Sequence, residues 1–339
     1  MRIGILSPSE IAYRRFMPAL NQIDGIEFAG IAVATQNEWF KGDEISEFDK
    51  IKEAEVNKAQ KFIDEFGGKL YLSYMDLIED DTIDAIYVPL PPALHYKWAK
   101  CVLENNKHVL VEKPATIDRE CTAELINIAK EKQLAFYENY MFVYHSQIEK
   151  VLEIASSGEI GKVWKYNIAF GFPRRALNDF RYNKELGGGA LIDCGGYTIK
   201  FANMLIENAE LKYAKLVQDD IKEDIDIFGN AIYTFGDKIV EVEFGMDHDY
   251  RCSLEIWGSE GSIKTNRILT APVGYMPVVD VYKNGEKNSY ELSSDDTFLK
   301  SIKRFICCVS DVNEREKVYG EVQTQADRVD EFIEMVKKG

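Results

Sequence analysis

Short runs of apolar residues alternate with amphipathic stretches through the first third of the chain. Runs rich in isoleucine, valine and alanine, with little polar alternation, are typical of parallel strands buried on both faces. Such runs occupy residues 2–6, 27–33, 85–88 and 108–111. Between them, helical spacing of apolar residues predicts helices over residues 11–22, 51–66 and 94–105. The repetition of strand and helix predicts a doubly wound parallel sheet.

After about residue 120 long strands dominate the pattern. A helix over 120–132, a strand over 134–138 and a helix over 148–156 come first. Strands separated in part by short turns follow at residues 162–171, 211–217, 225–234, 238–244, 251–257 and 278–282. Helical stretches at 298–309 and 321–338 close the chain. We therefore predict an α/β domain over residues 1–118 and an α+β domain with a large, open, mainly antiparallel sheet over residues 119–339.

The length, composition and net charge of the chain indicate which kinds of binding partner to expect. A length of 339 residues suits about two domains, and 46% hydrophobic with 29% charged residues is ordinary for a globular protein. The formal charge of −16 repels polyanions, so we expect neither nucleic-acid nor membrane binding. A helix N-terminus can still hold a single phosphate group.

The sequence predicts a cytoplasmic protein without a metal site. Its apolar runs are far shorter than the roughly 18 residues of a membrane helix, and the N-terminus turns polar at Ser7. The six cysteines lack Cys-x-x-Cys spacing, which predicts reduced thiols, and the four histidines are isolated from one another.

The turn after the first predicted strand is a candidate dinucleotide site. The dinucleotide fingerprint is G-x-G-x-x-G, because small residues let the backbone approach the pyrophosphate at a helix N-terminus. This chain has Ser7-x-Ser9-x-x-Ala12: all three residues are small, none is glycine, and Pro8 removes one donor. The alternative is a strand-to-helix turn with a serine cap. The candidate residues are Ser7, Pro8, Ser9, Glu10 and Ile11.

The end of the second strand bears on the choice between NAD and NADP. NAD-specific folds usually place an acidic residue there for the ribose 2′-hydroxyl, whereas NADP needs donors for a 2′-phosphate. Thr35 and Gln36 stand at this point, and no carboxylate appears before Glu38, which favours NADP over NAD. Additional sequence at residues 39–50 supplies Lys41 and Lys50, which either reach a 2′-phosphate or belong to a solvated acidic loop.

Three later motifs together resemble the glucose-fructose oxidoreductase, inositol dehydrogenase and rhizopine-catabolism (Gfo/Idh/MocA) family. They are Pro-Leu-Pro-Pro-Ala-Leu-His at residues 89–95, Glu-Lys-Pro at 112–114, and Gly-Gly-Gly-x-x-x-Asp-x-x-x-Tyr at 187–197. The similarity extends over most of the chain. It implies a Rossmann domain that carries NAD(P) and a sheet domain that forms a sugar pocket. It also implies a homodimer or homotetramer, associated through the open face of that sheet.

The resemblance implies catalytic roles for three side chains. Lys113 contacts the nicotinamide ribose and the reacting oxygen, Asp193 binds substrate or orients the acid, and Tyr197 takes the position of the family's His or Tyr. An ammonium group beside a nicotinamide stabilises charge that develops on oxygen during hydride transfer. Taken singly, the three residues have plainer explanations as a solvated lysine, a helix-terminal aspartate and a core tyrosine.

The resemblance also implies cofactor and substrate contacts beyond these three. The cofactor contacts are Pro89, Leu90, Pro91, His95, Glu112 and Lys113. The substrate contacts are Tyr144, Arg174, Arg181, Asp193 and Tyr197. Arg174, Arg175 and Arg181 lie in one loop, and guanidinium groups pair well with phosphate or carboxylate. Solvent-facing arginines explain the same loop equally simply.

These features predict an NAD(P)-dependent oxidoreductase. We expect hydride transfer between nicotinamide and a ring carbon of a sugar or sugar nucleotide, with the arginine loop favouring the nucleotide-linked form. One alternative is an NAD-dependent glycoside hydrolase of the same fold, which shows no net change in cofactor absorbance. The other is a non-catalytic nucleotide-binding sensor, which would not require Lys113, Asp193 and Tyr197 together.

Overall fold

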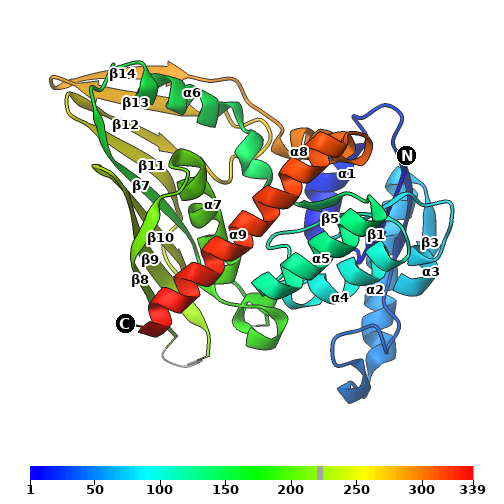
Figure 1. Cartoon of the computed structure of the whole chain (residues 1–339). Helices are drawn as coiled ribbons and strands as arrows, with labels where there is room; N and C mark the ends of the chain where they lie inside the picture. The colour runs from blue at the N-terminus through cyan, green and yellow to red at the C-terminus, as the bar shows by residue number, and fades with distance from the viewer. Residues whose placement is uncertain (177, 220–223, 339) are drawn as a thin grey trace. The chain divides into compact units, whose positions relative to one another are not determined.

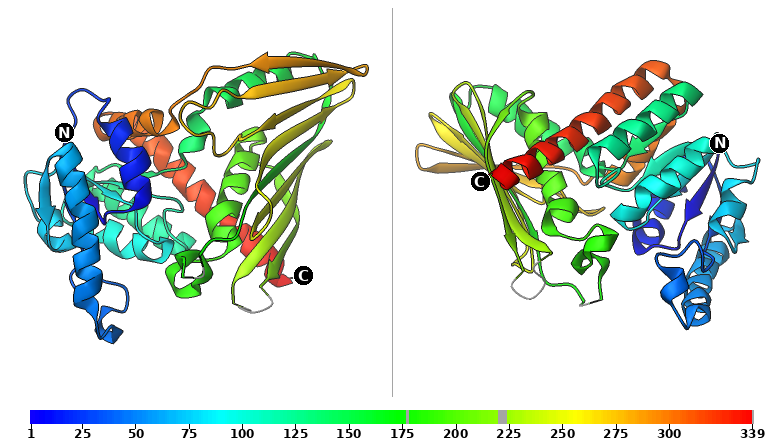
Figure 2. Two further views of the ribbon diagram at one scale, coloured as in Figure 1. Left: turned by 180° about the vertical axis from the view of Figure 1, so that it is seen from behind. Right: turned by 60° about the horizontal axis from the view of Figure 1, so that its bottom comes forward.

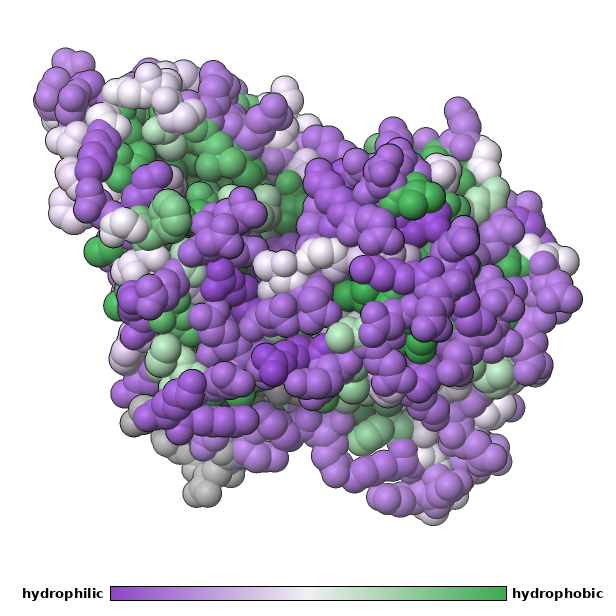
Figure 3. Space-filling model, in the orientation of Figure 1, coloured by the Kyte–Doolittle hydropathy of each residue, from purple (hydrophilic) through white to green (hydrophobic). Residues whose placement is uncertain are grey.

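The computed structural model describes residues 1–176, 178–219 and 224–338. The chain forms two compact units, which Figure 1 shows in one view and Figure 2 in two others. The first unit contains Met1–Asn139 and Phe298–Thr324, and the second contains Tyr140–Thr297 and the remainder of helix α9. Hydrophilic side chains cover most of the face seen in Figure 3, in keeping with the acidic composition. No helix in the described residues is long and apolar enough to cross a bilayer.

The first unit is built on a six-stranded sheet in the order β3-β2-β1-β4-β5-β6. All its strand pairs are parallel. The strands are β1 (Arg2–Leu6), β2 (Glu27–Ala32), β3 (Lys69–Tyr71), β4 (Ala85–Val88), β5 (His108–Val111) and β6 (Phe136–Glu138). Chain order reverses on either side of β1, and in doubly wound folds ligands bind beyond the carboxyl ends of the strands at this point.

The helices of the first unit either connect the strands of this sheet or lie at the end of the chain. They are α1 (Met17–Leu20), α2 (Phe48–Phe66), α3 (Tyr74–Ile78), α4 (Pro92–Glu104), α5 (Arg119–Lys132), α8 (Thr297–Ser310) and the first half of α9 (Val312–Lys338). Side-chain caps set two of the helix starts: Ser73 accepts the amide of Met75 before α3, and Asp118 accepts that of Cys121 before α5. All four residues of β4 are buried, as the apolar run predicts.

The second unit is built on an eight-stranded sheet in the order β14-β13-β12-β11-β7-β10-β9-β8. Its pairs are antiparallel except for β7 with β10, which run parallel. The strands are β7 (Val163–Phe172), β8 (Glu210–Gln218), β9 (Asp226–Phe235), β10 (Lys238–Met246), β11 (Arg251–Gly258), β12 (Gly261–Asn266), β13 (Val278–Lys283) and β14 (Glu286–Glu291).

Helices cover one face of this sheet. Figures 1 and 2 show α6 (Ser146–Ser156), α7 (Gly196–Leu205) and the end of α9 on the same side. The side chains of Val240, Val242 and Phe244 are buried at alternate positions of β10, as expected for one covered face. Trp257 and Ile239 remain 64% and 41% exposed, and both pair in register with Lys165 of β7.

The predicted fold class is confirmed, with several elements missed. Strands β3, β12 and β14 and helix α3 lack a sequence signal: β3 has three residues, and β14 reads Glu-Lys-Asn-Ser-Tyr-Glu with almost no apolar position. The last helix begins at Val312, nine residues before the predicted start at 321, because its first turns are polar. Short or exposed edge elements have little apolar periodicity to detect.

The compact units divide the chain at a different place from the predicted boundary at residue 118. Strand β6 pairs with β5, so the first unit continues to Asn139. Residues 298–324 return to it: the ring of Tyr137 lies 5.9 Å from that of Phe305, and its hydroxyl lies 3.0 Å from Ser301 Oγ. These contacts join segments more than 150 residues apart, which a change in local pattern does not reveal.

Candidate active site

The turn that carries Lys113 follows β5 and is held on both sides. The amide of Glu112 donates to Val88 O of β4 at 3.1 Å, and the peptide bond before Pro114 is cis. After the lysine, the amide of Ala115 donates to Glu138 Oε1 at 2.8 Å. The backbone on either side of Lys113 is therefore fixed to neighbouring strands.

His95 links this turn to the loop that follows β4. Its Nδ1 lies 2.7 Å from Pro114 O and its Nε2 lies 2.7 Å from Leu90 O. Burial lowers its pKa to about 4, although both carbonyl groups favour the protonated ring. The side chain is fully buried. In this structure His95 links the loop at 89–91 to the Lys113 turn, and its contact with the cofactor stays a prediction.

A buried polar chain lies beneath the same turn. The hydroxyl of Tyr87 donates to Glu112 Oε1 at 2.6 Å, and Asn139 Nδ2 donates to the same oxygen at 2.7 Å. Ser301 Oγ donates to Asn139 Oδ1 at 2.7 Å. Burial raises the pKa of Glu112 despite these donors. Sequence reasoning assigned no role to Glu138 or Asn139, whose only local signal is their place at and directly after the end of β6.

The first turn of the sheet suits a dinucleotide in spite of its serines. Ser7 adopts a left-handed backbone with φ of 75°, the conformation that glycine usually supplies. The amide of Ser9 donates to Ser7 O at 2.9 Å, and Ser9 Oγ accepts the amide of Ala12 at 3.2 Å. Pro8 is buried in this turn, whereas Glu10 is exposed. The tight turn and its small side chains therefore fit a pyrophosphate beside the backbone.

The loop after β2 is organised around Glu38. Thr35 donates to Glu38 Oε2 through its amide at 2.7 Å and through its hydroxyl at 2.9 Å. The other donors are Ser73 Oγ and the amides of Tyr74 and Met75, at 2.8, 3.1 and 2.9 Å. Gln36 Nε2 donates to Gly42 O at 2.8 Å.

In the second unit, the glycine-rich motif lets the chain pass close to two neighbouring groups. A Cβ at Gly188 would lie 2.5 Å from Arg181 O, and one at Gly189 would lie 2.3 Å from Asp226 Oδ1. Gly189 also has a φ of 117°. Asp226 accepts the amide of Leu191 at 2.6 Å, at the start of the helical segment that carries Asp193. Side chains at these glycines would displace that segment.

Asp193 lies in a π-helical turn, Leu191–Gly195, and is paired with an arginine. Arg181 Nε donates to Asp193 Oδ2 at 2.6 Å, and Arg181 Nη1 donates to Asp179 Oδ1 at 3.1 Å. Burial disfavours the charged guanidinium, but the two carboxylates raise the pKa of Arg181 above its ordinary value. The guanidinium predicted to contact a substrate phosphate is thus already engaged by two carboxylates.

Tyr197 lies one turn further along, in α7, and its ring packs among aromatic side chains. Ring centroids of Tyr140, Phe142 and Phe170 lie 5.2, 5.5 and 5.4 Å from that of Tyr197. Only 7% of Tyr197 is exposed. Packing on three sides fixes the direction of the phenol ring, and hence of its hydroxyl.

Two arginines of the preceding loop remain exposed. The guanidinium of Arg175 lies 5.1 Å from the centroid of the Phe172 ring, and Arg174 Nε lies 3.9 Å from Asp247 Oδ2 with the Arg174 side chain 61% exposed. Tyr182 Oη accepts the amide of Arg175 at 3.0 Å, which holds this part of the loop. Tyr144, the other predicted substrate contact, ends a short 3₁₀ turn, Met141–Tyr144, and is partly exposed.

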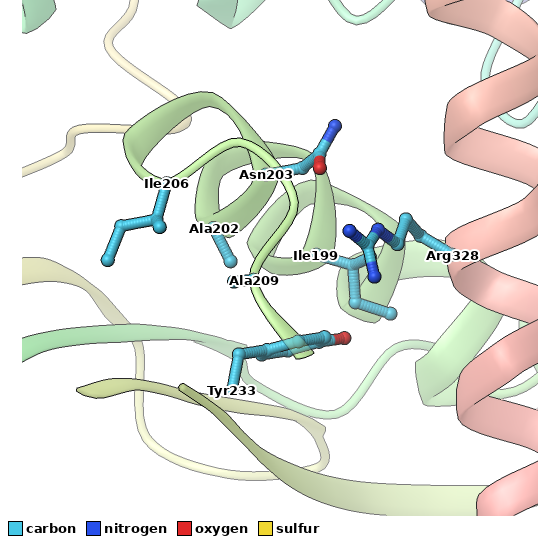
Figure 4. Close-up of a pocket in the computed structure, with 7 residues that line it drawn as sticks. All are labelled: Ile199, Ala202, Asn203, Ile206, Ala209, Tyr233 and Arg328. Atoms are coloured by element: carbon cyan, nitrogen blue, oxygen red, sulfur yellow. The ribbon is translucent and has the colours of Figure 1, made fainter. Parts of the chain in front are cut away.

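A small pocket elsewhere in the second unit contains none of the predicted residues. Its empty volume is about 190 Å³ with its open mouth included, and it lies between α7, β9 and α9 (Figure 4). The lining residues are Ile199, Ala202, Asn203, Ile206, Ala209, Tyr233 and Arg328. Among the described residues, no group of three or more His, Cys, Asp or Glu side chains is placed to hold a metal ion.

Two family profiles match the chain. An oxidoreductase family with an NAD-binding Rossmann fold matches residues 25–140, and a GFO/IDH/MocA C-terminal domain matches residues 148–264. A dTDP-3,4-didehydro-2,6-dideoxy-alpha-D-glucose 3-reductase of Actinomadura kijaniata is 33% identical over 90% of this chain and 86% of its own length. A D-xylose 1-dehydrogenase (NADP(+)) of Haloferax volcanii is 27% identical over 78% of this chain and 76% of its own.

Solved structures of related enzymes are similar to this chain over nearly its whole length. The 3-ketoreductase KijD10 from Actinomadura kijaniata, in complex with NADP and TDP-benzene, superposes with a TM-score of 0.88 at 32% identity, covering 99% of this chain and 97% of that one. Structures of KijD10 variants with one tyrosine changed to phenylalanine, or one lysine changed to alanine or glutamate, are also similar.

Proposed function

This chain belongs to the GFO/IDH/MocA oxidoreductase family, and from that premise we propose that it is a ketoreductase of nucleotide-linked sugars. It is an NAD(P)-dependent oxidoreductase that interconverts keto and hydroxyl groups of a sugar ring. A bound nicotinamide supplies or accepts the hydride. The turn at Ser7–Ser9, Thr35 and the loop at residues 89–91 would hold that cofactor, by their places at the carboxyl ends of β1, β2 and β4.

The observation that carries the proposal is the spacing of Lys113 and Tyr197. In KijD10 the lysine and the tyrosine changed in the variant structures are the same number of residues apart as Lys113 and Tyr197 are here. Local contacts support both assignments: His95 and Glu138 hold the backbone of the Lys113 turn, and three aromatic rings pack against Tyr197.

We assign charge stabilisation to Lys113 and proton donation to Tyr197. When the carbonyl oxygen of the sugar gains negative charge, the Lys113 ammonium stabilises it, and the Tyr197 hydroxyl supplies the proton. Asp193 is the weaker proton donor, because Arg181 holds its carboxylate at 2.6 Å and favours the ionised form. Asp193 therefore accepts a hydrogen bond from a sugar hydroxyl and so orients the ring.

We assign binding of the nucleotide half of the substrate to the exposed arginines. Arg174 and Arg175 are both exposed and share a loop with Arg181, which binds Asp193. Two exposed guanidinium groups in the loop that also carries Arg181 suit a diphosphate, since guanidinium pairs with phosphate oxygens in a fork. Arg181 contributes to the sugar end instead, through Asp193.

Cofactor oxidation in the presence of keto sugars tests the proposal. The purified full chain is mixed with NADH or NADPH and a panel of 3-keto and 4-keto dTDP-sugars, with the free keto sugars as controls. We expect the reduced cofactor to be consumed stoichiometrically with at least one dTDP-keto sugar, and faster than with its free counterpart. Equal rates with free and nucleotide-linked sugars would remove the nucleotide half of the proposal. Catalytic glycoside cleavage with no net change in cofactor would instead indicate the hydrolase.

Association into a homodimer or homotetramer in the cytoplasm remains part of the proposal. Trp257 and Ile239 are exposed on the uncovered face of the eight-stranded sheet, on the two strands that flank β7. Large exposed apolar side chains often mark association surfaces. Light scattering on the purified chain, compared with a Trp257→Lys variant, tests this: the variant should shift toward the monomer.

A further inference from the structure

The hydroxyl of Thr35 is restricted to one hydrogen-bonding role. It lies 2.9 Å from Glu38 Oε2, whose carboxylate also receives the amides of Thr35, Tyr74 and Met75 and the hydroxyl of Ser73. An ionised carboxylate only accepts hydrogen bonds. The single hydroxyl proton of Thr35 must therefore point at Glu38, and toward any other partner Thr35 Oγ1 presents lone pairs alone.

We propose that Thr35 and Glu38 make this enzyme select NAD(H) over NADP(H), which rests on the proposed function. A ribose 2′-hydroxyl can donate to the oxygen of Thr35. A 2′-phosphate presents acceptor oxygens and negative charge, so it meets an acceptor where it needs a donor. The absence of an acidic residue at the strand end by itself favours NADP. Here the oxygen of Thr35 takes over the acceptor role of that acid, because its proton is donated to Glu38.

The charge on Glu38 is maintained by its surroundings. Partial burial opposes ionisation, but the backbone and hydroxyl donors outweigh it and lower the pKa of Glu38. The carboxylate is a positioning group: it lies against Thr35 and the start of α3, and acts on the cofactor only by fixing the direction of the Thr35 proton.

Two neighbouring polar side chains that could serve a 2′-phosphate are already engaged. Gln36 Nε2 donates to Gly42 O at 2.8 Å, so this amide is engaged within the loop. Lys50 pairs with Glu47 at 2.8 Å. Acidic residues outnumber basic ones between Asn37 and Lys50: Glu38, Asp43, Glu44, Glu47 and Asp49 stand against Lys41 and Lys50. A phosphate dianion approaching this segment meets net negative charge.

Equilibrium binding distinguishes this inference from the proposed function. NADH and NADPH are titrated separately into the full-length protein without substrate, and binding is followed by the fluorescence of the reduced nicotinamide. We expect NADH to bind at least about tenfold more tightly, the effect of one good hydrogen bond or one ionic mismatch. Equal binding, or tighter binding of NADPH, would overturn the selectivity while leaving the oxidoreductase intact. Binding of neither below millimolar concentration would overturn the proposed function itself.

Matched variants assign the selectivity to residues. Thr35→Val keeps the shape but removes the acceptor, so NADH should bind about tenfold more weakly and NADPH should be nearly unaffected. Gln36→Arg adds a cation beside the ribose site and should strengthen NADPH binding. Glu44→Gln removes an exposed charge from the same segment and should leave the NADH to NADPH ratio within about twofold. If Glu44→Gln changes that ratio as much as Thr35→Val, general loop charge and not the Thr35 oxygen sets the preference.

Glu38→Met provides a second line of evidence. The thioether removes both carboxylate oxygens, so the Thr35 hydroxyl loses the acceptor that fixes its proton and can donate to another partner. The preference for NADH should therefore shrink. Thermal unfolding is recorded for each variant, because Glu38 also holds the start of α3. A folded Glu38→Met protein with unchanged selectivity would contradict the positioning role.

Discussion

Arg181 Nε and Asp193 Oδ2 lie 2.6 Å apart, and this pair joins a loop arginine to the aspartate of the glycine-rich motif. Only 23% of the Arg181 side chain and 11% of the Asp193 side chain is exposed. A partly desolvated pair of this kind fixes the orientation of both groups more than it adds stability. The arginine therefore orients the aspartate, and in the proposed function it acts on the substrate through Asp193.

Removing the guanidinium should misplace Asp193. We expect Arg181→Gln to lower kcat/KM by about 10²-fold, because small displacements of a positioning group carry costs of that order. Arg181→Lys should recover part of the loss. Asp179→Asn is the control, since it changes the other partner of Arg181 and leaves the Asp193 bond in place. Steady-state kinetics report the outcome, and equal losses in Arg181→Gln and Asp179→Asn would contradict the pairing as the cause.

Lys113→Ala should strongly reduce turnover without unfolding the protein. The backbone contacts on either side of the lysine, from Glu112 to Val88 and from Ala115 to Glu138, remain in the variant. We expect kcat to fall by about 10³-fold, within the range for loss of one group that stabilises charge on the reacting oxygen. Cofactor binding and the melting temperature are measured alongside. Lys97→Ala, at an exposed site of α4, should retain full activity.

Tyr197→Phe separates the hydroxyl from the ring. The phenyl ring keeps its packing against Tyr140, Phe142 and Phe170, so the melting temperature should change little. Loss of the proton donor should lower kcat by about 10²-fold or more. Tyr197→Ala should additionally destabilise the protein by about 3–5 kcal/mol through the cavity it leaves. A fully active Tyr197→Phe enzyme would rule out the assigned role.

Gly189→Ala tests why the motif needs glycine. A Cβ there would lie 2.3 Å from Asp226 Oδ1 on a backbone with φ of 117°. We expect a loss of about 2–4 kcal/mol in the free energy of unfolding, from overpacking together with backbone strain. Gly158→Ala is a matched control with φ of 86° and open space around it, and should cost about 1–2 kcal/mol. Urea denaturation compares the two, and equal costs would contradict a role for Asp226.

Two histidines, the buried His95 and the partly buried His108, should make stability depend on pH. Burial lowers the pKa of both His95 and His108 to about 4, from an ordinary value of 6.5. Between these values the unfolded chain binds more protons than the folded one, so the folded state loses stability as the pH falls. The loss should reach about 1.4 kcal/mol per pH unit for each histidine.

Urea denaturation between pH 7 and pH 5 measures this slope. The slope should decrease in a folded His95→Asn variant, and His248→Asn is the control because His248 is exposed. A His95→Asn protein with the parental slope would show that His95 does not titrate in this range.

Several features of the candidate site follow from local sequence, and others do not. Glu-Lys-Pro follows a buried strand and Asp193 precedes Tyr197 by one helical turn, so the local pattern is enough to place both motifs on their elements. The burial of His95 between two carbonyl groups and the contact of Glu138 with Ala115 leave no such trace. Their partners are distant along the chain, and local periodicity contains no information about them.

The sequence by itself determined the two kinds of sheet, because buried strands require apolar runs and amphipathic helices require a 3.6-residue period. It also located Lys113, Asp193 and Tyr197 by motif. Only the tertiary structure decided that Arg181 pairs with Asp193, and that Glu38 turns toward Thr35 and α3. Whether a charged side chain is free for a ligand depends on which donors and acceptors the fold brings within about 3 Å of it. Folding brings those groups together across the chain, so the residue types alone do not disclose them.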